Sequence, residues 1–119
     1  MKITVCVPMY NESSIIADTA STLHEYMTSK FGNGNFEIIF SNDGSRDGCD
    51  KIVRDMNLDG VIVTGYENNQ GKGCAVRHAC LEAKGKYVMF TDADLAYGTN
   101  VIERVYNLFL DNPDSDMII

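Results

Sequence analysis

The chain has 119 residues, of which 45% are hydrophobic and 23% charged, and its 17 acidic and 10 basic residues give a net charge of −7. This length predicts a single domain over residues 1–119. The acidic balance argues against nucleic acid as a partner, because a phosphate backbone is bound by basic surfaces. No stretch approaches the roughly 18 apolar residues of a membrane span, and MKITVCVPMYNE turns polar too early for a signal peptide.

Four cysteines, Cys6, Cys49, Cys74 and Cys80, are spaced unlike metal ligands. Two of them fall in patterns typical of buried residues. This favours reduced thiols and a cytoplasmic location.

Short apolar runs alternate with longer amphipathic runs along the chain. Strands are predicted at residues 3–8, 36–43, 60–66, 86–92 and 116–119. Helices are predicted at residues 13–31, 45–56 and 71–85, and from residue 100 onward. The alternation predicts an α/β fold, a parallel Rossmann-like sheet flanked by helices, in which the chain ends after about the fifth strand.

Each predicted helix has one apolar face. The faces consist of Ile16, Ala20, Leu23 and Met27 in the first helix, Ile52, Val53 and Met56 in the second, Ala75, Ala79 and Ala83 in the third, and Val101, Val105, Leu108 and Phe109 in the fourth. The small residues of the third helix would allow close packing on the sheet. Gly85 is predicted to cap the C-terminal end of that helix.

Polar clusters follow the first four predicted strands. They are Tyr10–Glu12, Asn42–Gly48, Glu67–Gly73 and Asp92–Asp94. In open parallel sheets, ligands bind in the crevice beyond the carboxyl ends of the strands. The four clusters are therefore expected to converge at one edge of the sheet and form a ligand site.

Two aspartates, Asp92 and Asp94, stand directly after an apolar strand. Two like charges this close repel each other, and a divalent cation would offset the repulsion. Carboxylate oxygens suit Mg²⁺ or Mn²⁺, which commonly combine one or two carboxylates with phosphate oxygens. The alternative is a polar turn that simply ends the strand.

The cluster after the second strand, NDGSRDG, is rich in turn-forming residues, so a plain strand-to-helix loop is one interpretation. Asp43 stands at the strand tip, where its carboxylate could accept a hydrogen bond from a base N–H or a ribose hydroxyl. Gly44 would let the backbone approach a ligand closely. Asp47 and Asp50 are predicted to favour the start of the next helix.

The cluster after the third strand, ENNQGKG, is not a P-loop, because five residues separate Gly65 from Gly71 and Lys72 is followed by Gly73. The G-x-G-x-x-G pattern is absent as well. Lys72 and Arg77 could still reach phosphates from the start of the third helix. The alternative for Arg77 is a solvated helix face.

Four motifs in register carry a family resemblance. VPMYNE, NDGSRDG, NNQGKGCAVRHA and TDADLA, which occur in order between Cys6 and Ala96, resemble those of family-2 glycosyltransferases of the GT-A fold. GKGCAVRHAC and TDADLAYG are most similar to the dolichyl- or polyprenyl-phosphate sugar transferases of that family.

The resemblance implies a nucleoside-diphosphate-sugar donor, carrying UDP or GDP. It assigns Pro8, Tyr10 and Glu12 to the nucleoside pocket, Asp43 to the base, Asp92 to the ribose or the metal, and Asp94 to the metal on the diphosphate. The metal would be Mg²⁺ or Mn²⁺.

The resemblance also implies inverting transfer by a carboxylate base that lies in the C-terminal half of the family's domain. No catalytic base is therefore expected before Ile119, and the chain is expected to be the N-terminal, donor-binding half. The acceptor could be a lipid phosphate at the cytoplasmic face of a membrane. An exposed sheet edge in this half predicts self-association.

Three other classes of protein share parts of this pattern. A receiver domain needs an aspartate at the end of the third strand and a lysine at the end of the fifth, whereas these strands read VTGYE and DMII. A sugar nucleotidyltransferase usually has a glycine-rich loop after the first strand, and PMYNESS has none. A non-catalytic nucleotide-binding module stays open as the alternative function.

Overall fold

Four parallel strands form the sheet of the computed structural model, which describes residues 2–95 and 98–111. The strands are β1 (Ile3–Met9), β2 (Phe36–Asp43), β3 (Val61–Tyr66) and β4 (Tyr87–Phe90). Their order is β3-β2-β1-β4, and every neighbouring pair is parallel. This confirms the predicted α/β class. The fifth strand, predicted at residues 116–119, lies outside the described residues.

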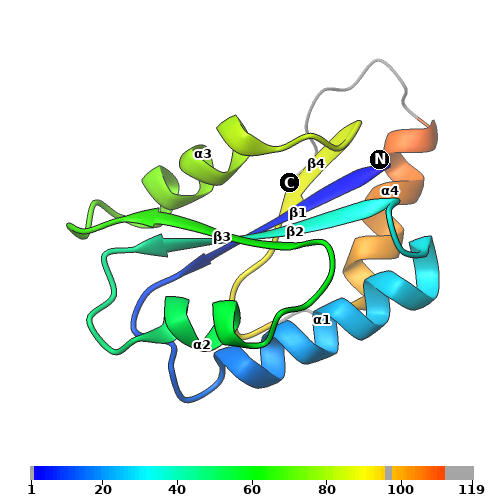
Figure 1. Cartoon of the computed structure of the whole chain (residues 1–119). Helices are drawn as coiled ribbons and strands as arrows, with labels where there is room; N and C mark the ends of the chain where they lie inside the picture. The colour runs from blue at the N-terminus through cyan, green and yellow to red at the C-terminus, as the bar shows by residue number, and fades with distance from the viewer. Residues whose placement is uncertain (1, 96–97, 112–119) are drawn as a thin grey trace.

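Four helices cover the two faces of the sheet. They are α1 (Ile16–Phe31), α2 (Cys49–Asp55), α3 (Lys72–Glu82) and α4 (Asn100–Asp111). Within the described part of the chain, α3 is the only helix on one face, and α1, α2 and α4 lie on the other (Figure 1). No helix within the described ranges is both long enough and apolar enough to cross a membrane.

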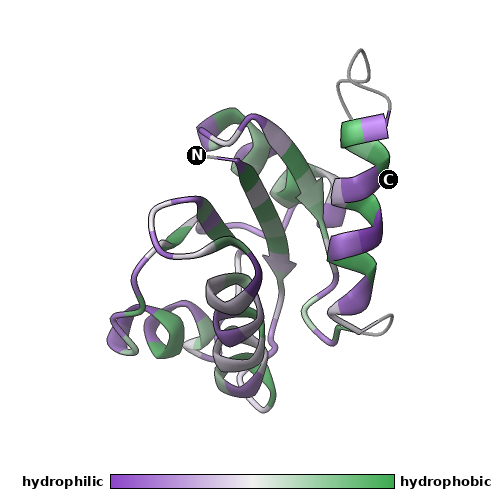
Figure 2. Ribbon diagram, turned by 90° about the vertical axis from the view of Figure 1, so that its right-hand side faces the viewer, coloured by the Kyte–Doolittle hydropathy of each residue, from purple (hydrophilic) through white to green (hydrophobic). Residues whose placement is uncertain are grey.

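The main hydrophobic core lies between the sheet and the three-helix face. Ile3, Val5 and Val7 of β1 pack there against the first helix, whose predicted face is fully buried. That buried face comprises Ile16, Ala20, Leu23 and Met27. Figure 2 shows the central strands largely hydrophobic, whereas the helices carry both hydrophobic and hydrophilic residues.

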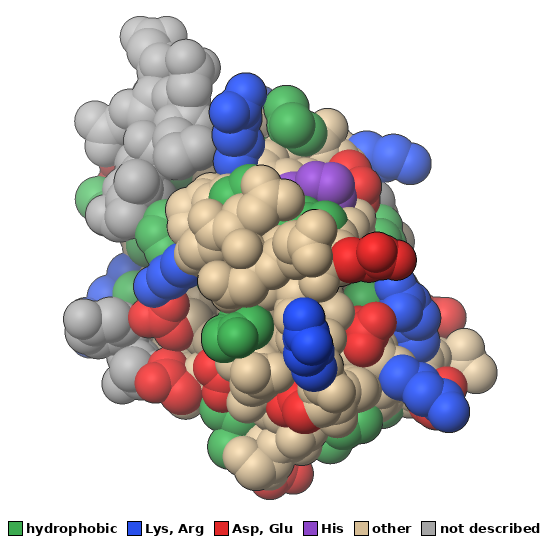
Figure 3. Space-filling model, turned by 90° about the vertical axis from the view of Figure 1, so that its left-hand side faces the viewer, with side chains coloured by type: hydrophobic (Ala, Val, Ile, Leu, Met, Phe, Trp, Pro, Cys, Tyr) green, Lys and Arg blue, Asp and Glu red, His purple; other side chains and the backbone are tan. Residues whose placement is uncertain are grey.

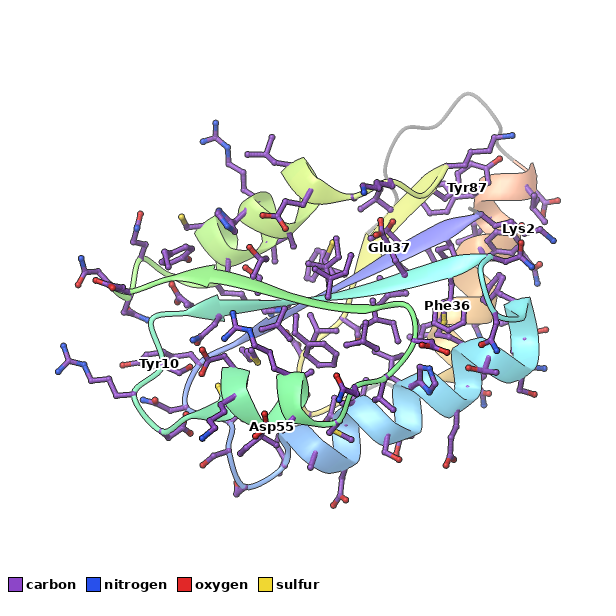
Figure 4. All side chains as sticks on the ribbon, viewed as in Figure 1. Lys2, Tyr10, Phe36, Glu37, Asp55 and Tyr87 are labelled. Atoms are coloured by element: carbon purple, nitrogen blue, oxygen red, sulfur yellow. The ribbon has the colours of Figure 1, made fainter. Side chains whose placement is uncertain are left out.

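A smaller core lies beneath α3. Cys6 of β1 and Ile39 of β2 pack there against Ala79, one of the predicted small residues. Because side chains alternate along a strand, the residues of β2 on this side also include Glu37 and Asp43. Figure 4 shows Glu37 on the α3 side of the sheet and Phe36 on the opposite side.

Strand β1 runs one residue beyond the predicted end, through Pro8 to Met9. The register of β1 with β4 stops at Cys6, so the β4 side of the strand has no ladder beyond that point. Pro8, which has no backbone N–H, is therefore tolerated at this position. The register with β2 continues through Pro8 and Met9.

Helices α1 and α2 begin at Ile16 and Cys49, later than the predicted starts at residues 13 and 45. Two predictions for single residues of the other helices also need correction. Gly85 does not cap α3, because the helix ends at Glu82 and Ala83 is extended. Gly85 instead approaches β1 so closely that a Cβ would lie 2.5 Å from the Thr4 nitrogen. In α4 the predicted apolar residue Leu108 is 46% exposed, whereas Ile102, which was not predicted, is fully buried.

Candidate functional site

A cavity of about 470 Å³ opens at the carboxyl edge of the sheet. It is lined by Pro8, Met9, Tyr10, Glu12, Asp43, Asn69, Gly71, Lys72, Asp92, Ala93 and Asp94. All four predicted clusters contribute, as expected for strand ends that meet at one edge. Figure 3 shows this edge of the molecule, where acidic side chains gather with basic ones between them.

The turns after β1 and β2 are tied together by hydrogen bonds. The Asn11 N–H donates to Ser45 Oγ at 2.9 Å, and the Arg46 N–H donates to Asn11 Oδ1 at 3.1 Å. The Ser13 N–H donates to Asp47 Oδ2 at 2.9 Å. These bonds join the two turns to each other beside the cavity.

Asp47 has a second role besides the one predicted at the start of α2. Its carboxylate accepts bonds from the N–H groups of Ser13 and Cys49. Desolvation would raise the pKa of this exposed carboxyl group, but the hydrogen bonds from Ser13 and Cys49 outweigh it and hold the pKa of Asp47 below its ordinary value of 3.8. The side chain thus joins two loops as well as preceding the helix.

The side chain of Asp43 links the turn after β2 to the turn after β3. It is buried, and its Oδ1 accepts from Tyr66 Oη at 2.6 Å and from the Gln70 N–H at 2.8 Å. Its Oδ2 accepts from Asn69 Nδ2 at 2.9 Å and from the Gly71 N–H at 3.0 Å. Asp43 therefore fixes the loop that leads into α3.

Gly44 is required by the same loop. Its φ of +73° is in the left-handed region, and a Cβ would lie 2.4 Å from the Asn69 nitrogen. The close neighbour in this structure is thus the protein backbone at Asn69. The prediction that Gly44 lets a ligand approach stays a prediction, since Gly44 does not line the cavity.

Two contacts hold residues 92–94, the segment after β4 that contains both aspartates. Thr19 Oγ1 on α1 donates to the Ala93 carbonyl. The Lys72 ammonium forms an ion pair with Asp92 Oδ1 across the cavity and lies 5.7 Å from the centre of the Phe90 ring. Both side chains are partly exposed, so solvent screens the pair and it contributes little to stability.

The carboxylates of Asp92 and Asp94 are suitable as part of the ligand set of a hard cation. No three His, Cys, Asp or Glu side chains of the described part of the chain are close enough to form a metal site by themselves. Asp92 and Asp94 nevertheless line one cavity, and Asp92 already pairs with a cation, the Lys72 ammonium. Mg²⁺ and Mn²⁺ commonly take one or two carboxylates and complete their shell with water and phosphate oxygens.

The cavity brings together most of the residues predicted from the sequence. Those residues are Pro8, Tyr10, Glu12, Asp43, Lys72, Asp92 and Asp94. Arg77 is exposed on α3 and does not line the cavity, so its predicted phosphate contact stays untested. Sequence reasoning missed Asn69 and Tyr66. Asn69 stands inside the quoted ENNQGKG cluster, and Tyr66 stands at the end of its strand.

A parallel α/β sheet with a cavity at its carboxyl edge, here lined by carboxylates and a lysine, is an architecture shared by many nucleotide-binding proteins. The sequence profile described as "Glycosyl transferase family 2" matches residues 4–119. The chain therefore belongs to glycosyltransferase family 2.

Two relatives illustrate the similarity. The dolichyl-phosphate beta-glucosyltransferase of Saccharomyces cerevisiae is 32% identical over 110 residues, which cover 87% of this chain and 33% of that protein. The poly(ribitol-phosphate) beta-glucosyltransferase of Bacillus spizizenii is 29% identical over 115 residues, covering 94% of this chain and 18% of that protein.

Solved structures of GT-A glycosyltransferases share the fold. S. aureus TarS 1–349 in complex with UDP has a TM-score of 0.71 at 31% identity, covering 79% of this chain and 28% of that one. The mannosyltransferase PcManGT from Pyrobaculum calidifontis, in complex with GDP-Man and Mn²⁺, has a TM-score of 0.66 at 29% identity, covering 78% of this chain and 27% of that one. The chain spans about a third or less of these relatives.

Proposed function

We propose that this chain is the donor-binding part of an inverting, metal-dependent glycosyltransferase that takes a sugar from a UDP- or GDP-sugar. One observation carries the proposal: the four strand-end turns enclose a single cavity that contains a lysine and a carboxylate pair. Its volume of about 470 Å³ falls within the usual range of ligand pockets.

The two sides of the cavity suit the two parts of such a donor. Pro8, Tyr10 and Glu12 line the β1 side, where the 47% exposed Tyr10 ring offers a flat surface to a nucleoside. Lys72, at the first position of α3, offers a cation to a diphosphate, reinforced by the helix N-terminus. The Lys72 ammonium would then exchange its Asp92 partner for phosphate oxygens.

Asp92 and Asp94 would hold Mg²⁺ or Mn²⁺ beside the diphosphate. The bound ion would neutralise charge on the leaving diphosphate. Support comes from the carboxylate pair in the cavity and from the Mn²⁺ named with GDP-Man in the PcManGT structure. Loss of the Lys72 partner on donor binding would leave Asp92 able to take up the ion.

The acceptor side is proposed to lie outside residues 1–119. Inverting transfer needs a carboxylate base near the acceptor hydroxyl, and the cavity carboxylates are assigned to the donor and its metal. The relatives named as dolichyl-phosphate glucosyltransferases support a lipid phosphate as acceptor, and hence a site of action at a membrane. Action at its cytoplasmic face stays a prediction. Self-association through a sheet edge stays a prediction.

Titration calorimetry tests donor binding directly. UDP and GDP are titrated into residues 1–119 with and without Mn²⁺, and we expect saturable heat for at least one nucleotide that is stronger with the ion. Asp94→Asn should abolish the metal-dependent part while leaving the fold intact, since it keeps the size of the side chain and relieves the repulsion between two neighbouring like charges.

Asp55→Asn is the matched control, because Asp55 ends α2 away from the cavity. It should bind nucleotide as the wild type does. No heat from either nucleotide with Mn²⁺ would contradict the proposal. A lower melting temperature for Asp94→Asn with unchanged affinity would assign the aspartates a structural role.

A further inference from the structure

Tyr66 ends β3 and stands directly opposite Asp43 in the parallel register. Its side chain is on the α3 side of the sheet, and its hydroxyl donates to Asp43 Oδ1 at 2.6 Å. Tyr66 does not line the cavity. It therefore contacts a residue of the site rather than the space in which a ligand would lie.

The bond from Tyr66 leads through Asp43 to the start of α3. Asp43 holds the N–H groups of Gln70 and Gly71, at 2.8 Å and 3.0 Å from its nearer oxygens. The next residue is Lys72, whose ammonium pairs with Asp92. Tyr66 is thus the first member of a continuous chain of contacts that ends at the cation of the cavity.

Tyr66 is itself fixed by α3. Its ring meets the His78 ring edge to face, with centroids 5.6 Å apart and planes at 82°. His78 Nε2 lies 3.0 Å from Thr64 Oγ1, and Thr64 Oγ1 donates to Glu82 Oε1 at 2.9 Å. Burial first, and then the bond to Asp43, raise the pKa of the Tyr66 hydroxyl, so it stays a donor.

We propose that Tyr66 is a positioning residue for the diphosphate side of the donor site: it orients Asp43, and Asp43 holds the 69–71 loop so that Lys72 faces the cavity. The inference rests on the proposed function for what Lys72 would bind. This role is distinct from a contact between Asp43 and the nucleoside base, because such a contact would not affect binding on the diphosphate side of the site.

The test uses Tyr66→Phe, which removes the hydroxyl and keeps the ring that packs on His78. Tyr106→Phe is the matched control, because Tyr106 packs against Phe31 and Tyr87, near the amino ends of the strands. The probes are Mn²⁺-pyrophosphate, UDP with Mn²⁺ and GDP with Mn²⁺, titrated well below the melting temperature of every variant.

Tyr66→Phe is expected to weaken all three ligands by a similar factor, about tenfold for the loss of one hydrogen bond to a carboxylate. Tyr106→Phe should bind them as the wild type does. Unchanged affinity for pyrophosphate in Tyr66→Phe would overturn the proposal, whether or not the nucleotides weaken.

A second readout needs no ligand. Amide hydrogen exchange of the free chain should become faster at Gln70 and Gly71 in Tyr66→Phe and stay unchanged in Tyr106→Phe. Unchanged exchange at Gln70 and Gly71 would overturn the positioning role of Tyr66. Failure of the wild type to bind any probe would instead overturn the proposed function, so the two failures are distinguishable.

Discussion

Two buried carboxylates on β2 fasten the two ends of α3, and they differ in what surrounds them. At the carboxyl end, Asp43 holds the Gln70 and Gly71 N–H groups before the helix. At the amino end, Glu37 accepts from the Lys84 N–H after the helix and from Thr4 Oγ1 at 2.7 Å. The same chemistry anchors both loops.

The difference lies in the space beside each carboxylate. Asp43 lines the cavity, and both of its oxygens have donors. Glu37 is 1% exposed, and its Oε1 has no hydrogen-bond partner among the described residues. At the carboxyl edge of a parallel sheet the loops diverge and leave a crevice. Position in the sheet therefore decides which anchor lines the cavity and which lies in the closed interior of the fold.

The largest expected effect comes from removing the anchor at the cavity. Asp43→Ala leaves the Tyr66 hydroxyl and the Gln70 and Gly71 N–H groups without their acceptor. The loop that places Lys72 is then released, and affinity for UDP with Mn²⁺ should fall by about 100-fold. Calorimetry measures the affinity; a variant that binds UDP as the wild type does would remove Asp43 from the site.

A substitution at Gly44 tests the packing of the same loop. Gly44→Ala should destabilise the chain by about 3 kcal/mol, because the left-handed φ and the approach to Asn69 both exclude a side chain. Gly48→Ala is the matched control, since its φ of +79° is similar but a Cβ would meet nothing within 4 Å.

Gly48→Ala should cost about 1 kcal/mol, the strain alone. Both values come from urea denaturation. Equal losses of stability in the two variants would show that the close approach to Asn69 is not the reason why position 44 requires glycine.

Glu37 should affect stability without affecting binding. Glu37→Ala leaves the Thr4 hydroxyl and the Lys84 N–H without an acceptor, which should cost about 2 kcal/mol. Glu37→Gln should cost less, because its amide oxygen can replace Oε2 as the acceptor and the neutral amide places no charge in this buried site. Denaturation measures both variants.

The UDP affinity of both Glu37 variants should equal that of the wild type. A drop in affinity for Glu37→Gln at unchanged stability would mean that the amino end of the sheet also serves the ligand site.

The fold could be predicted because its signals are local. The helical spacing of Ile16, Ala20, Leu23 and Met27 appears in the sequence, and those four residues are buried. Strand and helix alternation predicts a parallel sheet, and a parallel sheet brings its carboxyl ends together. The convergence of the four polar clusters follows from topology alone and requires no knowledge of side-chain contacts.

The contacts inside the site could not be predicted, because they depend on three-dimensional register. Tyr66 matters since β3 pairs with β2 so that it stands opposite Asp43. No spacing in the sequence reports this, because the two residues are 23 positions apart. Likewise Gly44 meets Asn69 only once both loops are folded.

Mapping of backbone amide shifts on addition of UDP and Mg²⁺ tests the central claim most directly. The account predicts shifts at residues 9–12, at Asp43, at residues 69–72 and at residues 92–94, the turns that line the cavity. It predicts none around Glu37 and Lys84. Shifts confined to the amino end of the sheet, or no shifts at any of the four turns, would contradict it.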